Sequence, residues 1–380
     1  MSKIAAVSVS VVRVPLDRVT SFATRDVTAR EYCLVKISAA GSEIQGIGFC
    51  YVGHSSGNIA KVVVEELLAP KLIGQESTRV EGLWEDMYSE GLLHGRAGTT
   101  VRAISALDIA LWDLNARAAS LPLYRYLGCW ADVEVPAYAS GGYYLNAKLT
   151  DHLGEEMAAY VKDGFKAVKM KVGRLTPKEE EVRVCVAREA IGPDCLLMLD
   201  ANNAWRDLPT ALLYCKRFEK YDPYWIEEPF GPDDIENHAK LAERTDISVA
   251  TGEIEVGRWR FRELLERKAA EIIQPDAAVC GGISEWRRIA QTAASYGITV
   301  SPHWFDHLHA HLVAAAPNAR YVEYFPNHDV FNFRKLLDRQ LQVKNGNLLL
   351  SQSPGLGFEF DEKAVAAYAL NPGRVWTHIT

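Results

Sequence analysis

The sequence predicts an α/β fold: a (β/α)₈ TIM-type barrel, preceded by an α+β capping domain that the C-terminal tail completes. Its 380 residues are enough for two domains. In the second part, short β-type runs alternate with amphipathic helical segments, and the runs end in chargeable or metal-binding side chains. We assign residues 1–125 to the cap, 126–350 to the barrel and 351–380 to the tail that returns to the cap.

The barrel prediction depends on eight apolar runs. They are Val133–Ser140, Ala167–Lys171, Leu196–Asp200, Trp225–Glu228, Val249–Glu253, Ile272–Asp276, Thr299–His303 and Tyr321–Tyr324. From Lys171 to Glu323, the polar residues at successive run ends lie 20 to 29 positions apart. One strand, one helix and two loops need about that length, and eight runs fit a closed barrel better than a six-stranded open sheet.

The first 125 residues predict a meander of strands followed by helices. The expected strands are Ala6–Val14, Glu31–Ser38 and Ile44–Tyr51, and the expected helices are Ala60–Ala69 (ending before Pro70), Arg79–Leu92 and Val101–Ala118. Near the C-terminus, Lys344–Asn347 carries an Asn-Gly hairpin signal, and the glycine-rich Pro354–Gly357 loop is expected to fold back onto the cap.

Composition excludes several classes of protein. The formal net charge of −7 argues against a nucleic-acid or anionic-membrane partner, although a local metal or cation could still bind an anionic substrate. The seven cysteines are scattered and never form a CxxC pair, which favours thiols in a reducing cytoplasm. With no signal-peptide pattern and no apolar stretch of about 18 residues, we expect a soluble cytoplasmic protein.

Three carboxylates, Asp200, Glu227 and Glu253, end three consecutive runs. In a barrel, the C-terminal ends of all strands meet at one mouth, so these side chains should lie together. One such acid could be a salt-bridged rim residue, but three would repel one another unless a divalent cation lay between them. All-oxygen ligation favours Mg²⁺ or Mn²⁺ over zinc.

Candidate bases flank these acids in the sequence. Lys169 and Lys171 point to the same face of one strand, so each ammonium should lower the pKa of the other and make one a proton acceptor near neutral pH. His303 ends the seventh run and Asp276 the sixth. An Asp on the neighbouring strand can hold an imidazole in one tautomer and raise its basicity.

The motifs that hold these residues cover nearly the whole chain. They are Lys169-Met170-Lys171, Leu199-Asp200-Ala201-Asn202, Ile226-Glu227-Glu228-Pro229, Thr251-Gly252-Glu253, Gln274-Pro275-Asp276, Gly281-Gly282-Ile283, Ser301-Pro302-His303 and Val322-Glu323. Together they resemble the mandelate racemase subgroup of the enolase superfamily. Phe49 departs from the pattern, because many members carry an acid there; it lies in the predicted cap, so the chemistry should be untouched.

The resemblance implies a role for each residue of the set. Asp200, Glu227 and Glu253 would be the metal ligands, Lys171 one base and the Asp276–His303 dyad the other acid/base. Glu323 would be a protonated acid that donates to the enediolate oxygen. Lys169 would tune Lys171 and touch the substrate carboxylate, and Asn202 would contact substrate or metal. Members of this subgroup are often octamers or dimers, so a homo-oligomer is expected.

Three further features have competing interpretations. His307, His309 and His311 follow His303 closely; a second metal site is conceivable, but helix-surface or supporting histidines fit better because no acid pattern accompanies them. Arg25, in a predicted cap loop, could pair with a second carboxylate or hydroxyls of the substrate, or be a solvated surface residue. The glycine pairs Gly46-x-Gly48 and Gly95-x-x-Gly98 lack a nucleotide-binding context.

The predicted reaction is Mg²⁺-dependent removal of the proton next to a carboxylate, giving an enediolate. If the next carbon carries a hydroxyl, His303 can protonate it and water leaves. We therefore expect dehydration of a sugar acid, an aldonate or aldarate, to a 2-keto-3-deoxy acid. The alternative is a racemase or epimerase of a 2-hydroxy acid, with Lys171 and His303 as opposed bases. A non-enzymatic binding protein would not need the full residue set.

Overall fold

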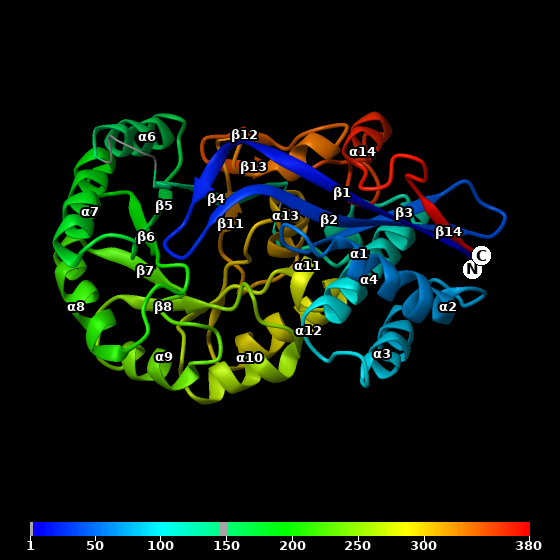
Figure 1. The fold of residues 1–380 in the computed structure, drawn as a ribbon, viewed down its shortest axis with the longest axis horizontal. Helices are drawn as coiled ribbons and strands as arrows, with labels where there is room; N and C mark the ends of the chain where they lie inside the picture. The colour runs from blue at the N-terminus through cyan, green and yellow to red at the C-terminus, as the bar shows by residue number, and fades with distance from the viewer. Residues whose placement is uncertain (1–2, 132, 145–149, 328) are drawn as a thin grey trace.

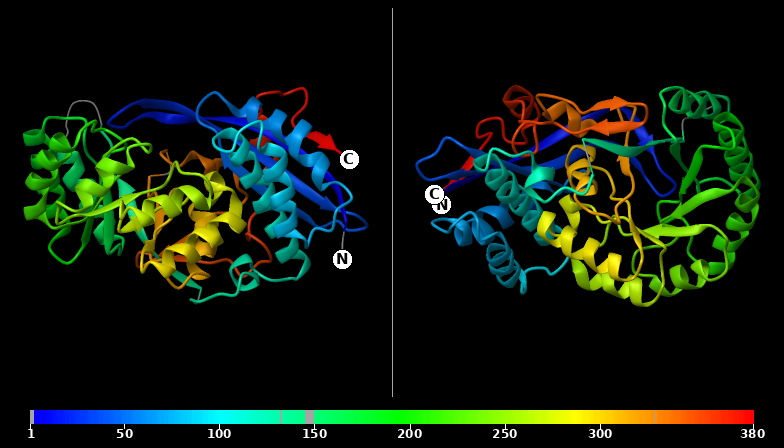
Figure 2. Two further views of the ribbon diagram at one scale, coloured as in Figure 1. Left: turned by 90° about the horizontal axis from the view of Figure 1, so that it is seen from below. Right: turned by 180° about the vertical axis from the view of Figure 1, so that it is seen from behind.

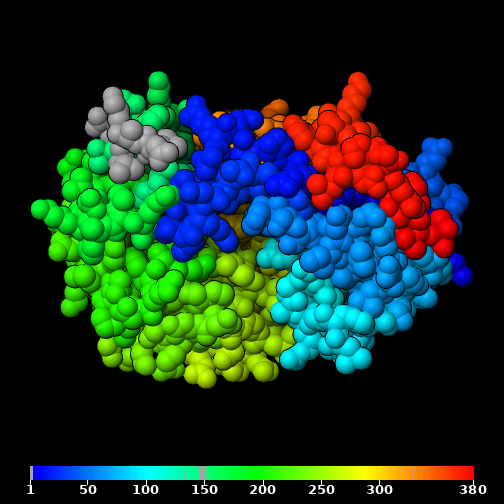
Figure 3. All heavy atoms as spheres, viewed as in Figure 1, coloured from blue at the N-terminus to red at the C-terminus, as the bar shows by residue number. Residues whose placement is uncertain are grey.

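The computed structural model describes residues 3–131, 133–144, 150–327 and 329–380 (Figure 1). A barrel with an outer ring of helices lies beside a smaller cap of strands and helices, and the first two strands reach from the cap across the barrel (Figures 1 and 2). In the space-filling view, these N-terminal strands cover part of the barrel (Figure 3). This arrangement encloses the end of the barrel on which the candidate residues lie.

The cap sheet is antiparallel, with strand order β14-β1-β2-β3. Its strands are β1 (Ile4–Ser21), β2 (Asp26–Ala39), β3 (Gln45–Tyr51) and β14 (Thr377–Ile379). Successive side chains alternate between two faces: Cys33 and Val35 pack in a core shared with the cap helices, whereas Tyr32 and Leu34 pack in a core shared with the barrel. The cap sheet is therefore buried on both sides.

The cap helices follow β3. They are α1 (Gly57–Val62), the π-helix η1 (Val63–Leu68), α2 (Ala69–Leu72), α3 (Val80–Gly91), α4 (Thr99–Ala118) and α5 (Leu123–Tyr126). The expected stop before Pro70 is wrong. A π-turn precedes Pro70, which lies in the first turn of α2, where its missing N–H costs little.

The two glycines of Gly46-x-Gly48 allow β3 to approach α4 closely. A Cβ on Gly46 would overlap the backbone of Ala110, and one on Gly48 would overlap the backbone of Ala106. Their role is therefore packing within the cap.

Eight parallel strands form the barrel. They are β4 (Glu134–Gly141), β5 (Ala167–Lys171), β6 (Leu196–Asp200), β7 (Pro223–Glu227), β8 (Ser248–Thr251), β9 (Ile272–Ile273), β10 (Thr299–Val300) and β11 (Val322–Tyr324). The order runs from β4 to β10, β11 pairs with β4, and a bridge from Val300 to Ala319 links β10 to the segment before β11. The predicted barrel is thus confirmed.

Helices follow the barrel strands. They are α6 (Asp151–Lys162), α7 (Pro177–Ile191), α8 (Leu208–Phe218), the 3₁₀-helix η2 (Glu219–Tyr221), α9 (Ile235–Ala242), α10 (Gly257–Glu266), α11 (Ala277–Cys280), α12 (Gly282–Ser295) and α13 (Asp306–Ala314). Within the described ranges, no helix is both long and apolar enough to cross a membrane.

Three barrel strands are shorter than the sequence predicted. Glu253, Asp276 and His303 lie two or three residues beyond β8, β9 and β10. The breaks have local causes, because Gly252 adopts a φ of 125° after β8, while Pro275 and Pro302 lack the N–H that a ladder needs.

The C-terminal part returns to the cap. It contains the 3₁₀-helix η3 (Asn332–Leu336), the hairpin of β12 (Gln342–Lys344) and β13 (Asn347–Leu349), helix α14 (Glu362–Tyr368) and β14. The predicted hairpin is therefore confirmed. The backbone of Gly355 pairs with Leu121 and Leu123, and β14 pairs with β1, so the tail does fold onto the cap.

Candidate active site

The three predicted carboxylates lie together at the barrel mouth. Asp200 ends β6 and is in register with Glu227, which ends β7, while Glu253 follows β8. Each side chain is buried, and one oxygen from each lies within 4.8 Å of the others. Burial and then repulsion by Asp200 raise the pKa of Glu227 to about 8. Burial and the neighbouring acids therefore both disfavour the charged form of Glu227.

Lys169 and Lys171 lie on β5, whose five residues are all buried. Lys171 Nζ contacts Asp200 Oδ2, and Lys169 Nζ lies 2.6 Å from Glu227 Oε1. The expectation that the pair is mutually acidified is wrong for these contacts. Burial lowers the pKa of Lys171 and Lys169 lowers it further, but Asp200, Tyr143 and Glu227 together outweigh both and raise it.

Glu323, on β11, lies on the other side of Lys169, with Oε1 2.8 Å from its Nζ. Its Oε2 accepts a hydrogen bond from the Trp304 backbone N–H at 2.9 Å. Burial raises the pKa of Glu323, but the positive charges of Lys169 and His303 outweigh it and lower the pKa to about 2. In the chain without metal, these neighbours favour the ionised carboxylate over the protonated acid that the resemblance implies.

His303 and Asp276 form the predicted dyad. Nδ1 of His303 lies 3.2 Å from Asp276 Oδ2, and its Nε2 lies 3.5 Å from Glu253 Oε2. Burial lowers the pKa of His303, but Glu253 and the bond to Asp276 raise it to about 9. Asp276 is fixed in turn, because its Oδ1 accepts from the Ala278 N–H at the start of α11.

The two predicted substrate contacts also reach this site. Asn202 lies beside Asp200, and its N–H donates to Asp200 Oδ1 at 2.9 Å. Its own Oδ1 is buried without a hydrogen-bond partner among the described residues. Arg25, in the turn between β1 and β2, lines the same cavity as Asn202, Lys171 and His303, although much of its side chain is exposed.

The three histidines on α13 have packing roles. They are buried, so the helix-surface expectation is wrong. His311 Nδ1 accepts a hydrogen bond from the Tyr124 N–H, and its Nε2 lies 3.2 Å from the Leu356 carbonyl. His309 Nε2 accepts a hydrogen bond from the Ala277 N–H. His307 pairs with Asp306. Among the described residues, the Asp200–Glu227–Glu253 group is the one cluster with metal-site geometry.

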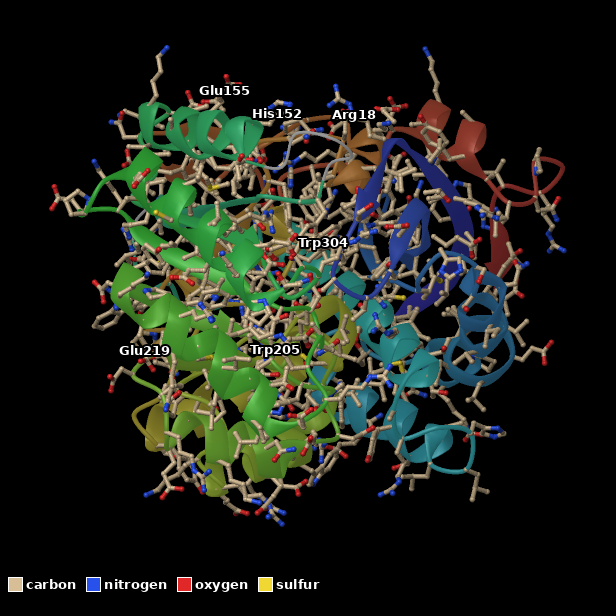
Figure 4. All side chains as sticks on the ribbon, turned by 60° about the vertical axis from the view of Figure 1, so that its left-hand side comes forward. Arg18, His152, Glu155, Trp205, Glu219 and Trp304 are labelled. Carbon is tan, nitrogen blue, oxygen red and sulfur yellow. The ribbon has the colours of Figure 1, made fainter. Side chains whose placement is uncertain are left out.

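The residues of the site that were not predicted include Tyr138, Trp304 and Arg30. The Tyr138 hydroxyl lies 3.4 Å from Lys169 Nζ. Trp304, central in Figure 4, has a φ of 71° and stacks on His303. Arg30 lines the cavity from the cap and could have been found from strand alternation, because it shares the barrel-facing parity of Tyr32 and Leu34.

The donor set fits a hard divalent cation. Three buried carboxylates supply oxygen ligands, and no cysteine or histidine belongs to the described cluster. A cation between the acids would offset the repulsion by Asp200 and Glu253 that adds to burial in raising the pKa of Glu227. The orphaned Asn202 Oδ1 beside Asp200 is a further free acceptor. With Lys171 and His303 lining the same cavity, the site has the groups of an acid/base enzyme that works on a carboxylate bound at a metal.

Fold and site together thus define a capped (β/α)₈-barrel enzyme of acid/base chemistry. Residues 152–364 match the family described as enolase C-terminal domain-like, and residues 4–128 match the mandelate racemase / muconate lactonizing enzyme N-terminal domain. The chain belongs to the mandelate racemase subgroup of the enolase superfamily.

Relatives of this chain include dehydratases and a racemase. It is 33% identical over 359 residues to the L-talarate/galactarate dehydratase of Salmonella typhimurium, covering 93% of this chain and 86% of the relative. L-talarate dehydratase from a Polaromonas species, solved with Mg and L-glucarate, superimposes with a TM-score of 0.89 at 32% identity, covering 100% and 99% of the two chains. A magnesium-bound racemase from Streptomyces coelicolor has a TM-score of 0.90 at 28% identity, covering 97% and 100%.

Proposed function

We propose that this chain is a Mg²⁺-dependent hydro-lyase that converts a sugar acid, an aldonate or aldarate, into a 2-keto-3-deoxy acid. The observation that carries the proposal is the cavity in which Lys171 and His303 line the wall beside the Asp200–Glu227–Glu253 cluster. The L-talarate/galactarate dehydratase and the L-talarate dehydratase among its relatives support this reaction class.

Asp200, Glu227 and Glu253 would hold the Mg²⁺, with Mn²⁺ as a substitute, and Asn202 would contact metal or substrate. When bound, the cation would neutralise these acids, bind the substrate carboxylate and stabilise the negative charge of the enediolate. Lys169, buried between Glu227 and Glu323, would donate to the same carboxylate.

Lys171 would act as one base. Its pKa is high because Asp200 is its counter-ion. Lys171 can therefore release a proton only when Asp200 binds the metal instead. Once Asp200 is a metal ligand, repulsion from Lys169 and from the cation would lower the pKa of Lys171 and allow it to accept the proton from the carbon next to the carboxylate.

His303 would act as the acid in dehydration. Glu253 is the first of the charges that raise its pKa in the chain without metal; with Glu253 engaged as a metal ligand, Asp276, 3.2 Å from Nδ1, and Glu323 would still favour the protonated imidazole. Asp276 holds Nδ1, so Nε2 is the nitrogen directed toward Glu253 and the cavity. Nε2–H would donate its proton to the departing hydroxyl, which leaves as water. Glu323 has a different role: it would accept hydrogen bonds from Lys169 and from the Trp304 backbone N–H, and so fix the lysine that touches the substrate.

The second candidate is a racemase or epimerase of a 2-hydroxy acid, with Lys171 and His303 as opposed bases. The observation that favours it is the partly aromatic lining of the cavity by Phe22, Tyr51 and Phe325. The racemase among the structural relatives is consistent with this alternative.

One assay separates the two functions. The Mg²⁺-loaded protein is incubated in deuterium oxide with a library of sugar acids, and each mixture is analysed for 2-keto acid and for deuterium at C2. Dehydration predicts keto product with at least one acid, and Lys171→Ala and His303→Ala should abolish it. Deuterium incorporation with no keto product would reject dehydration and support the racemase.

We also propose a division of the chain into domains, a cytoplasmic location and a homo-oligomeric state. Residues 1–125 would form the cap, 126–350 the barrel and 351–380 the tail. The cap boundary lies near the end of the N-terminal family match at residue 128, whereas the C-terminal match covers residues 152–364. All seven cysteines are free thiols, as expected in the cytoplasm. A homo-oligomer is expected for this subgroup, and light scattering of the purified protein tests it.

A further inference from the structure

Arg30 is a buried cation with no acidic partner among the described residues. It lies on β2, is 2% exposed, and no carboxylate oxygen of the described residues lies within 4.0 Å of its guanidinium. Among the described residues, the guanidinium makes one hydrogen bond, from Nη1 to the Val330 carbonyl at 2.5 Å. A charge buried without a counter-ion is costly, so such an arginine is expected where a ligand supplies the anion.

The guanidinium is also fixed in place at the substrate cavity. It lies 4.6 Å from the ring of Trp304, the residue after His303. Arg30, Lys171 and His303 all line this cavity. An arginine has five N–H donors, and Val330 takes one of them, so donors remain for a ligand.

The carboxylates that line the cavity are already engaged. Glu323 pairs with Lys169 at 2.8 Å, and Glu253 lies 3.5 Å from His303 Nε2. Neither reaches Arg30 among the ion pairs of the described residues. A second anion on the substrate would therefore compensate Arg30, and a planar carboxylate matches its two-pronged geometry.

We propose that Arg30 binds the distal carboxylate of a dicarboxylic substrate, so that the chain acts on aldarates in preference to aldonates. This inference rests on the proposed dehydratase function and deepens it. The reacting carboxylate would lie at the acid cluster on the barrel, whereas Arg30 approaches the same cavity from the cap sheet. Arg25 also comes from the cap, but it is exposed to water, so it should discriminate less between a carboxylate and a hydroxyl.

The test compares acid pairs of one configuration, a hexarate and the hexonate that differs from it only by a terminal CH₂OH. The Mg²⁺-loaded wild-type protein should show a kcat/KM about 100-fold or more higher for the diacid. Arg30→Gln should lower kcat/KM for the diacid by about 100-fold, mainly through KM, and change the value for the monoacid by less than about fivefold. Arg30→Lys keeps the charge but not the two-pronged geometry, so its kcat/KM for the diacid should lie between the values of wild type and Arg30→Gln.

Arg13→Gln is the matched control, because Arg13 lies on the neighbouring strand β1 with 49% of its side chain exposed. Arg13→Gln should leave kcat/KM for both the diacid and the monoacid unchanged. Thermal unfolding identifies any variant that does not fold. Equal wild-type rates on the two acids, or an equal loss on both in folded Arg30→Gln, would overturn the inference and leave the dehydratase function standing. Absence of keto product from every acid would overturn the function itself.

Discussion

The environment of His303 predicts a pH dependence of stability that can be measured without substrate. In the chain without bound metal, folding raises the pKa of this imidazole from its ordinary value of 6.5 to about 9. A raised folded-state pKa stabilises the protein fully below the unfolded value, and the stabilisation is lost as pH rises from 6.5 to about 9. The free energy of unfolding should therefore fall across this range.

The magnitude follows from the same contacts. Burial opposes the charge, but Glu253, 3.5 Å from Nε2, and Asp276, 3.2 Å from Nδ1, outweigh it. At about 1.4 kcal/mol for each pH unit between the two pKa values, the effect amounts to about 3 kcal/mol.

Urea unfolding in the presence of EDTA, at about pH 6 and about pH 10, measures this loss. Wild type should lose about 3 kcal/mol more than His303→Gln between the two conditions. The control is His152→Gln, since the side chain of His152 is 61% exposed on α6 (Figure 4); this variant should behave like wild type. If wild type and His303→Gln lose the same free energy, the reasoning about this pKa is refuted.

Two further predictions concern the metal site and the contact between cap and barrel. Mg²⁺ at 100 times its dissociation constant should stabilise wild type by about 2.7 kcal/mol and raise its unfolding temperature. Glu227→Gln should abolish this rise, whereas the control Glu255→Gln, which removes a partner of Arg260, should keep it. An unchanged rise in Glu227→Gln would exclude Glu227 as a ligand. Gly282→Ala should destabilise the chain by about 2–4 kcal/mol in thermal unfolding, because the φ of Gly282 is 92° and a Cβ would overlap Asp108 of α4. The control Gly297→Ala, at a φ of 72° with open space around it, should cost only about 1 kcal/mol. Equal losses of stability in the two variants would contradict the overlap.

The barrel could be predicted from the sequence because buried parallel strands are continuous apolar runs. Residues 167–171 and 196–200 have the predicted bounds. The ends of β8 to β10 could not be predicted as well, since Glu253, Asp276 and His303 reach the mouth from loops and not from the ladder. Their positions depend on how Gly252, Pro275 and Pro302 turn the chain.

The site was only partly predictable for a related reason. Asp200 and Glu227 lie at strand ends of one barrel, so their proximity follows from topology. Arg30 reaches the same cavity from another sheet, and no spacing along the chain fixes how a cap packs on a barrel. Strand parity would have placed Arg30 on the face shared by Tyr32, but not beside Trp304.

The lysine pair shows most clearly what spacing alone omits. Lys169 does lower the pKa of Lys171, as two cations on one strand face must, but Asp200 raises it by more. The sign of the net effect depends on every charge within a few ångströms and not on the pair. Binding of a divalent cation to Asp200 would remove the raising charge and add a lowering one. Lys171 would therefore become a base only when the cation is bound. Proton transfer to Lys171 would then depend on the same cation that stabilises the enediolate formed by that transfer.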